Sequence, residues 1–151
     1  MVGFAYATVS GSLRRQPVIW AADQTAATPL AMPTGMNVGQ ALGISDSGLI
    51  VGYGAEASGQ FGSTNVQTLV WSDPATVYVL ADLVTNAPGW QFTGTVAGLS
   101  LNSTLVTEAV DPQGQRRFVM LQLVPEPGTC LALVAGLGLA LGTRPRHVGG
   151  R

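Results

Sequence analysis

An internal repeat constrains the fold of this 151-residue chain more than any other feature. Residues 2–20 (VGFAYATVSGSLRRQPVIW) and 51–71 (VGYGAEASGQFGSTNVQTLVW) both open with Val-Gly-aromatic, pass through a polar turn that contains glycine, and close with an aliphatic residue and tryptophan. Residues 42–53 (LGISDSGLIVGY) also align without a gap over residues 97–108 (AGLSLNSTLVTE), and residues 106–123 form a weaker third copy. A period of about 50 residues indicates a fold built from repeated structural units.

Each unit is predicted to hold about four short strands. The runs GLIVGYG (48–54) and TLVTEAV (104–110) are β-rich and are bounded by turn residues. SDSG (45–48) and DPQG (111–114) are typical turns, because Asp and Ser side chains cap local N–H groups and Gly tolerates positive φ. QTLVW and RRFVML would be the returning strands of two hairpins, and TVYVLADL (76–83) alternates as a strand buried on both faces would.

We therefore predict an all-β fold of blade-like, propeller-type antiparallel repeats, since about four strands in about 50 residues is the size of one propeller blade. The units are expected at about 1–50 and 51–105, with a partial unit at 106–123, so that a β-repeat domain covers residues 1–123. A propeller needs about four to eight blades, so we expect the array to be incomplete. A start at an internal methionine would also explain why the N-terminal residues lack the ordered regions of a secretory signal.

The units resemble the HAF repeats of bacterial extracellular proteins, which read as a glycine-isoleucine-polar turn, then Val-Gly-aromatic, then an aliphatic-Trp strand. The matching residues are Gly43, Ile44, Asp46, Gly48, Val51, Gly52, Tyr53, Val70 and Trp71. The His-Ala-Phe triplet that names the family is replaced here by QPVIW and QTLVW. The resemblance covers about the first 123 residues and implies an extracellular location.

The residues from 124 to 151 are predicted to be a separate tail. Residues 127–143 carry no charge, and as a helix they would span about 25 Å, against a hydrocarbon core of about 30 Å. We predict a short transmembrane helix at 128–143, followed by a basic end at 144–151 that holds the C-terminus in the cytoplasm. The alternative is a buried core helix. Two observations favour the membrane: the segment is apolar around its whole circumference, and Pro-Glu-Pro isolates it from the repeats.

This tail resembles the PEP-CTERM sorting signal of bacterial exported proteins. The match consists of the motif Pro125, Glu126 and Pro127, the apolar residues from Leu131 to Leu141, and the topology-determining Arg144 and Arg146. The resemblance implies anchoring in the inner membrane and cleavage near Pro-Glu-Pro by a membrane-embedded exosortase. Release or attachment at the cell surface or in an exopolysaccharide matrix would follow. HVGGR extends beyond the more usual compact arginine cluster.

The composition excludes several classes of activity. The one histidine, His147, and the one cysteine, Cys130, both lie in the tail. Residues 1–123 therefore cannot supply a Ser-His-Asp or Cys-His catalytic system, or a zinc or iron site with His or Cys ligands. There is no lysine, and up to residue 124 four arginines stand against seven acids, which offers no basic footprint for nucleic acid. No cofactor motif is present, and no metal site is expected.

Two sets of side chains remain as candidates for chemistry. A glycosidase would need two carboxylates about 5–9.5 Å apart, but most acids here sit beside turn residues, where capping is the ordinary role. The acids are Asp23, Asp46, Glu56, Asp73, Asp82, Glu108 and Asp111. A sugar-stacking surface could draw on Tyr6, Tyr53, Tyr78, Phe92 and three tryptophans. Trp20 and Trp71 recur at matching repeat positions, which favours packing, so Trp90 in the turn-like NAPGWQF is the best exposed candidate.

These observations favour an exported, non-catalytic protein of the bacterial surface or extracellular matrix. The alternative is a carbohydrate-binding module that recognises exopolysaccharide through exposed aromatics around Trp90. An exported hydrolase that uses carboxylates is the weaker alternative. The expected partners are the membrane and an exosortase-type processing enzyme, with exopolysaccharide as a ligand under the alternative.

Overall fold

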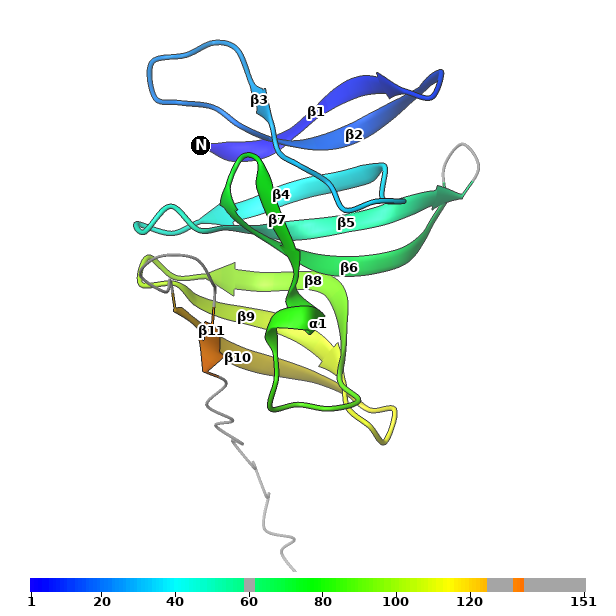
Figure 1. The fold of residues 1–151 in the computed structure, drawn as a ribbon, viewed down its shortest axis with the longest axis vertical. Helices are drawn as coiled ribbons and strands as arrows, with labels where there is room; N and C mark the ends of the chain where they lie inside the picture. The colour runs from blue at the N-terminus through cyan, green and yellow to red at the C-terminus, as the bar shows by residue number, and fades with distance from the viewer. Residues whose placement is uncertain (59–61, 125–131, 135–151) are drawn as a thin grey trace, which may run out of the picture.

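Three antiparallel β-sheets lie one above another, in the order in which the chain forms them (Figure 1). The computed structural model describes residues 1–58, 62–124 and 132–134. The first sheet contains β1 (Val2–Val9), β2 (Ser12–Ile19) and β3 (Thr28–Pro29). The middle sheet contains β4 (Val38–Ile44), β5 (Ile50–Ser58), β6 (Gly62–Asp73) and β7 (Thr76–Val79). The last sheet contains β8 (Gln91–Leu99), β9 (Thr104–Val110), β10 (Arg116–Val124) and β11 (Ala132–Val134).

Within each sheet the strands follow one another in chain order, with antiparallel neighbours throughout. The middle and last sheets have four strands each and the first sheet has three, and the all-β class is confirmed. In the part of the chain that the structure describes, no sheet is closed. The propeller arrangement therefore stays a prediction.

The ladders of the middle and last sheets share one register. The corresponding pairs are Ala41–Gly52, Gly43–Val51 and Ile44–Ile50 in the middle sheet, and Val96–Thr107, Gly98–Val106 and Leu99–Leu105 in the last sheet. Both ladders also shift register at the same place, between Ala41 and Gly43 and between Val96 and Gly98. The sequence repeat is thus a structural repeat. In the middle sheet the Val-Gly-aromatic motif lies at the start of the second strand, β5, so the sheets are divided at residues 30–37 and 80–90 and not at the ends of the sequence repeats.

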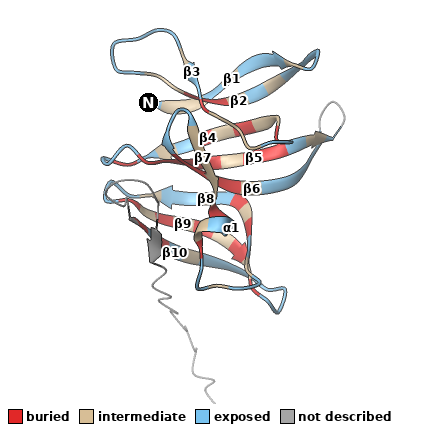
Figure 2. Ribbon diagram, viewed as in Figure 1, coloured by how far each residue is buried: buried red, intermediate tan, exposed pale blue. Residues whose placement is uncertain are grey.

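Two apolar clusters hold the three sheets together. The cluster between the first and middle sheets consists of Leu30, Met36, Ala41, Ile50, Leu69 and Trp71. The cluster that joins the middle sheet to the last consists of Leu49, Val51, Val70, Leu80, Val84, Phe92, Leu105, Ala109, Leu121 and Leu123. Since side chains alternate along a strand, Ile50 enters one cluster and Val51 the other, and the middle sheet is buried on both faces (Figure 2).

The predicted strand at 76–83 is wrong in its second half. β7 ends at Val79, and Leu80–Leu83 form the single helical turn α1. The Leu80 side chain is fully buried in the cluster between the middle and last sheets. A helical turn at this point buries Leu80 while the chain crosses from one sheet to the next, which a continued strand on β6 would not do.

Most of the predicted tail lies outside the described residues, including Pro125, Glu126, Pro127, Arg144 and Arg146. Ala132–Val134 are described, and the helix prediction for 128–143 is wrong at these three residues. They form β11, antiparallel to β10, in the place that β7 has in the middle sheet. Pairing with β10 satisfies backbone groups that the β10 edge would otherwise expose. Within the described ranges, no helix has the length and apolarity that a membrane span requires.

Candidate functional site

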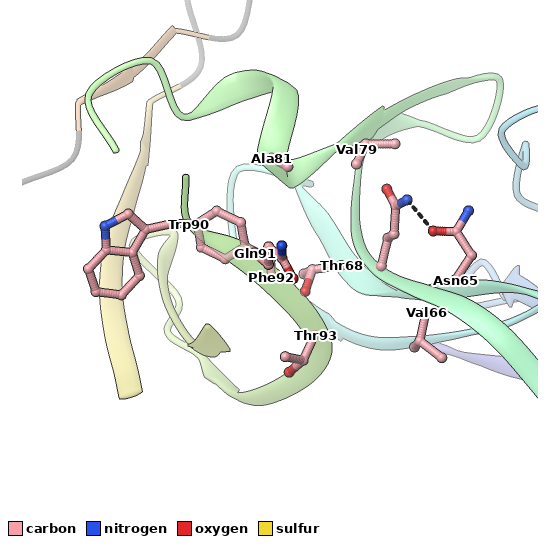
Figure 3. Close-up of a pocket in the computed structure, with 10 residues that line it drawn as sticks. Asn65, Val66, Thr68, Val79, Ala81, Trp90, Gln91, Phe92 and Thr93 are labelled. Carbon is pink, nitrogen blue, oxygen red and sulfur yellow. Dashed lines mark hydrogen bonds between the residues drawn. The ribbon is translucent and has the colours of Figure 1, made fainter. Parts of the chain in front are cut away.

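A pocket of about 390 Å³ opens between the middle and last sheets, where β6 faces the start of β8 (Figure 3). The β6 wall is polar apart from one valine, and the β8 wall carries two aromatic rings. The lining residues are Asn65, Val66, Gln67 and Thr68 on β6, Val79 at the end of β7, Ala81 in α1, and Trp90, Gln91, Phe92 and Thr93 at β8.

Trp90 stands at one end of this pocket and is fixed by its turn and by the core. The backbone N–H of Trp90 donates to the Ala87 carbonyl at 3.3 Å, and Gly89, between the two residues, adopts a φ of 82°. The Trp90 ring is half-buried against the cluster between the middle and last sheets, and Phe92, which is 8% exposed, belongs to that cluster. Trp90 is therefore both a packed residue and a wall of the pocket, which leaves part of its ring accessible.

A chain of amide hydrogen bonds orients the polar wall. Gln67 Nε2 donates to Asn65 Oδ1 at 2.7 Å (Figure 3), and Asn65 Nδ2 donates to Glu56 Oε1 at 2.9 Å. Asn65 also adopts a positive φ of 52°, a conformation that asparagine tolerates better than most residues. An amide has two N–H donors and a carbonyl acceptor. Asn65 and Gln67 therefore keep further donor and acceptor capacity, held in fixed directions beside the pocket.

Gly94 sets how closely β8 approaches β6 beside this pocket. Its φ is +80°, and a Cβ at this position would lie 2.5 Å from Val66 Cγ1. Its N–H donates to Thr68 Oγ1 at 3.2 Å, which ties the last sheet to the middle sheet. A residue with a side chain would need both a strained backbone and a wider gap between the strands.

A second hollow, a groove of about 950 Å³, lies between the first and middle sheets and includes Arg14, Arg15, Tyr6 and Tyr53. The Arg15 guanidinium lies 4.9 Å from the centroid of the Phe4 ring, and a hydrogen bond with Tyr6 raises the pKa of Arg15 above its ordinary value. The sequence analysis did not predict this groove. The signal that could have found it is the hairpin register, which sets Tyr6 opposite Arg15.

The two tryptophans at matching positions of the sequence repeat, Trp20 and Trp71, were predicted to be packing residues, and both pack against neighbouring residues. Trp71 is fully buried in the cluster between the first and middle sheets, and its Nε1 donates to the Ala31 carbonyl at 2.6 Å. Trp20 is partly buried, and its ring lies so close to Gly3 that a Cβ there would be 3.1 Å from it.

Three of the carboxylates, Asp73, Glu108 and Asp111, are engaged in local structure. Arg117 Nε donates to Asp111 Oδ2 at 2.7 Å, and this bond lowers the pKa of Asp111 below its ordinary value. Glu108 accepts from Thr93 at 3.0 Å and pairs with Arg116 at 3.3 Å, and the Thr93 bond is the main cause of its lowered pKa. The Asp73 pKa is likewise lowered, chiefly by Thr76, as the carboxylate caps the β6–β7 turn.

A general acid at neutral pH needs a raised carboxyl pKa, and these three shifts have the opposite direction. Among the residues that the structure describes, no three His, Cys, Asp or Glu side chains gather in a group that could hold a metal ion.

Comparison of the chain with protein-family models, with curated proteins and with solved structures finds no match.

Proposed function

We propose that this chain is an exported, non-catalytic protein of the bacterial cell surface or extracellular matrix. In this proposal the stacked sheets are a scaffold, and the tail directs membrane anchoring and processing by an exosortase-type enzyme. The observation that carries the proposal is the order of three features at the end of the sequence. Pro125–Pro127 comes first, an apolar run follows, and Arg144 and Arg146 come last.

Three of the carboxylates support a non-catalytic role. Asp111 and Glu108 each form an ion pair with an arginine, and Asp73 caps a turn. Each of these carboxyl groups has a pKa shifted toward the ionised form, which suits ion pairing and capping and disfavours proton donation at neutral pH.

The sorting proposal is tested by expressing the full chain behind a secretory signal in a bacterium that has an exosortase. We expect an intact membrane-bound form, followed by a shorter form cut near Pro-Glu-Pro. The triple variant Pro125→Ala, Glu126→Ala, Pro127→Ala should remain at its full length in the membrane fraction. Asp23→Ala, an exposed acid in the β2–β3 loop, is the matched control and should be processed normally. Wild-type chain that stays uncut and water-soluble would contradict the proposal.

A second candidate function is binding of a neutral polysaccharide in the Trp90 pocket. The favouring observation is that the rings of Trp90 and Phe92 and the oriented amides of Asn65 and Gln67 line one hollow. An apolar ring can cover the C–H face of a sugar, while amides bond its hydroxyl groups. Small-ligand sites commonly combine aromatic side chains with a few placed polar groups.

Calorimetry of the full chain with uncharged exopolysaccharide oligomers tests this candidate. Trp90→Ala should weaken binding by at least about tenfold, and Asn65→Ala should weaken it by less, because Gln67 remains. Trp90→Phe should retain most of the affinity, since a ring is kept. Leu101→Ala is the control, because Leu101 is 67% exposed and lies outside the pocket. Equal affinity of Trp90→Ala and wild type would exclude the pocket as the site.

A further inference from the structure

The groove of about 950 Å³ between the first and middle sheets is basic, although the chain around it is mildly acidic. Its lining includes Arg14 and Arg15 from β2, and no acidic residue is among the described residues that line it. Residues 1–124 as a whole carry seven acids and four arginines. A hollow lined by one sign of charge concentrates ligands of the opposite sign. The groove therefore favours an anionic ligand.

Aromatic neighbours orient the Arg15 side chain in this groove. Tyr6 lies opposite Arg15 in the β1–β2 ladder, and hydrogen bonds with the hydroxyl groups of Tyr6 and Tyr53 act on the Arg15 guanidinium. The Cζ atom of Arg15 lies 4.9 Å from the centroid of the Phe4 ring, and the Phe4 and Tyr6 rings meet edge to face with their centroids 5.7 Å apart. A guanidinium has five N–H donors, so these contacts orient the group and leave donors for a ligand.

Arg15 differs from the two arginines of the last sheet, which both have a carboxylate partner. Arg116 pairs with Glu108 at 3.3 Å, and Arg117 pairs with Asp111 at 2.7 Å. Among the described residues, no carboxylate forms such a pair with Arg15, which is exposed. Its positive charge is therefore oriented without being neutralised, and an incoming anion need not displace a carboxylate.

The repeat places this groove where the next pair of sheets also has a hollow. Arg14 lies six residues before Trp20, as Asn65 lies six residues before Trp71. Asn65 lines the Trp90 pocket, between the middle and last sheets. A hollow between neighbouring sheets thus recurs at one repeat position, with an amide in one copy and a guanidinium in the other. The Trp90 pocket is present although β4 covers the edge of β5, so such a hollow results from the packing of two sheets and not from an open sheet edge.

We propose that this groove binds an acidic sugar, with the sugar carboxylate on the Arg15 guanidinium and the sugar ring against the Tyr6 ring. A guanidinium binds a carboxylate through two parallel N–H bonds. The Tyr6 side chain is 59% exposed, and an aromatic ring can cover the C–H face of a sugar. The hydroxyl groups of Ser12 and Ser63 also line the groove. Because hydroxyl groups both donate and accept, this lining suits a sugar better than an acidic peptide. The site is separate from the Trp90 pocket and does not depend on it.

The first test varies the ligand and keeps the wild-type chain. Calorimetry of the full chain in a nonionic detergent at low salt compares oligogalacturonate with the same oligomer after methyl esterification of its carboxyl groups. The ester has the same sugar rings and no charge, and we expect it to bind at least about tenfold more weakly. Added salt should weaken binding of the acidic oligomer, since ions screen an exposed pair. No variant is involved, so the result does not depend on the folding of a mutant.

The second test varies the protein. Arg15→Gln should weaken binding of oligogalacturonate by at least about tenfold, because it removes the charged donor. Arg15→Lys should bind between the two, since lysine keeps the charge but lacks the planar fork. Arg116→Gln is the matched control: it makes the same change in net charge at a side chain that is 72% exposed in the last sheet. It should bind within about twofold of wild type.

Nuclear magnetic resonance of the isotope-labelled full chain locates the ligand. On saturation with oligogalacturonate, the Nε–H signal of Arg15 should shift, because this group donates to the carboxylate. The Nε–H signal of Arg117, which already donates to Asp111, should stay in place.

Four results would overturn the proposal. Absence of binding of oligogalacturonate to the wild-type chain would exclude the site. Equal affinity for the methyl ester would mean that the carboxylate is not recognised. Equal losses in Arg15→Gln and Arg116→Gln would assign the effect to overall charge and not to this groove. Equal affinity for an oligomer of glutamate would identify an acidic peptide, and not a sugar, as the class of ligand.

Discussion

The middle and last sheets are one repeat in two surroundings. The cross-strand pair Val51–Val70 in the middle sheet corresponds to Val106–Met120 in the last sheet. Val51 and Val70 are fully buried, whereas Met120 is 62% exposed. The difference shows that the local sequence of a repeat determines strand order and register, while the neighbouring sheet determines burial.

The exposed face of the last sheet follows from its place in the stack. Phe118 and Met120 on β10 alternate with Leu121 and Leu123, which face the middle sheet and are buried. No described sheet lies on the Phe118 side. Substitutions at equivalent repeat positions should therefore have unequal effects on stability.

The largest difference is expected between Trp71→Ala and Phe118→Ala. Trp71 is fully buried and donates a hydrogen bond to Ala31, so its removal should lower the free energy of unfolding by about 3–5 kcal/mol. Phe118 is 67% exposed, and its loss should cost no more than about 0.5 kcal/mol. Urea unfolding of the full chain measures both. Similar losses would mean that the two faces are equally buried.

Gly94→Ala and Gly98→Ala form the next comparison, within one strand. The Gly94 backbone is strained for other residues, and a Cβ would strike Val66. We expect a loss of about 2–4 kcal/mol, from backbone strain and overpacking together. At Gly98 a Cβ has no neighbour within 4 Å, so alanine should be nearly neutral. Thermal unfolding checks the pair, and a neutral Gly94→Ala would refute the close approach of β6 and β8.

Val70→Ala and Met120→Ala compare equivalent positions directly. Val70→Ala removes two buried methyl groups and should cost about 2 kcal/mol. Met120→Ala should cost less than about 0.5 kcal/mol, because the side chain is already in water. The midpoints of denaturant curves at low protein concentration give both values. A loss at Met120 as large as that at Val70 would show that another surface covers β10.

The smallest effect concerns the hairpin turn of the last sheet. Asp111 accepts bonds from Arg117, Gln113 and Gln115, and its pKa is lowered mainly by Arg117. A lowered folded-state pKa stabilises the fold above the ordinary Asp value of about 3.9, and this contribution is lost as pH falls through the folded-state pKa.

Asp111→Asn should therefore lower the free energy of unfolding at pH 7. The difference in this free energy between variant and wild type should disappear as the pH falls below about 4. Asp46→Asn, at an exposed turn, should show no such gap at either pH. A gap for Asp111→Asn that persists at low pH would assign the effect to the turn hydrogen bonds and not to the charge.

The sequence predicted the local parts of this structure well. SDSG and DPQG do form turns between paired strands, and the recurrence of Trp71 correctly indicated packing. Contacts between sheets were not predictable, because nothing local in Asn65 or Gln67 shows that β8 will bring Trp90 to the same pocket. The turn at Leu80 was missed for the same reason, since its helical form serves packing between sheets.

Native-state hydrogen exchange of the full chain tests the central claim, that one repeat is buried on both faces in the middle of the stack and on one face at its end. The ladder pairs Ile50–Trp71 and Leu105–Leu121 occupy equivalent positions. The amides of Ile50 and Trp71 should exchange only through global unfolding, while those of Leu105 and Leu121 exchange through smaller openings of the last sheet. Equal protection of the two pairs, or slower exchange in the last sheet, would contradict this account.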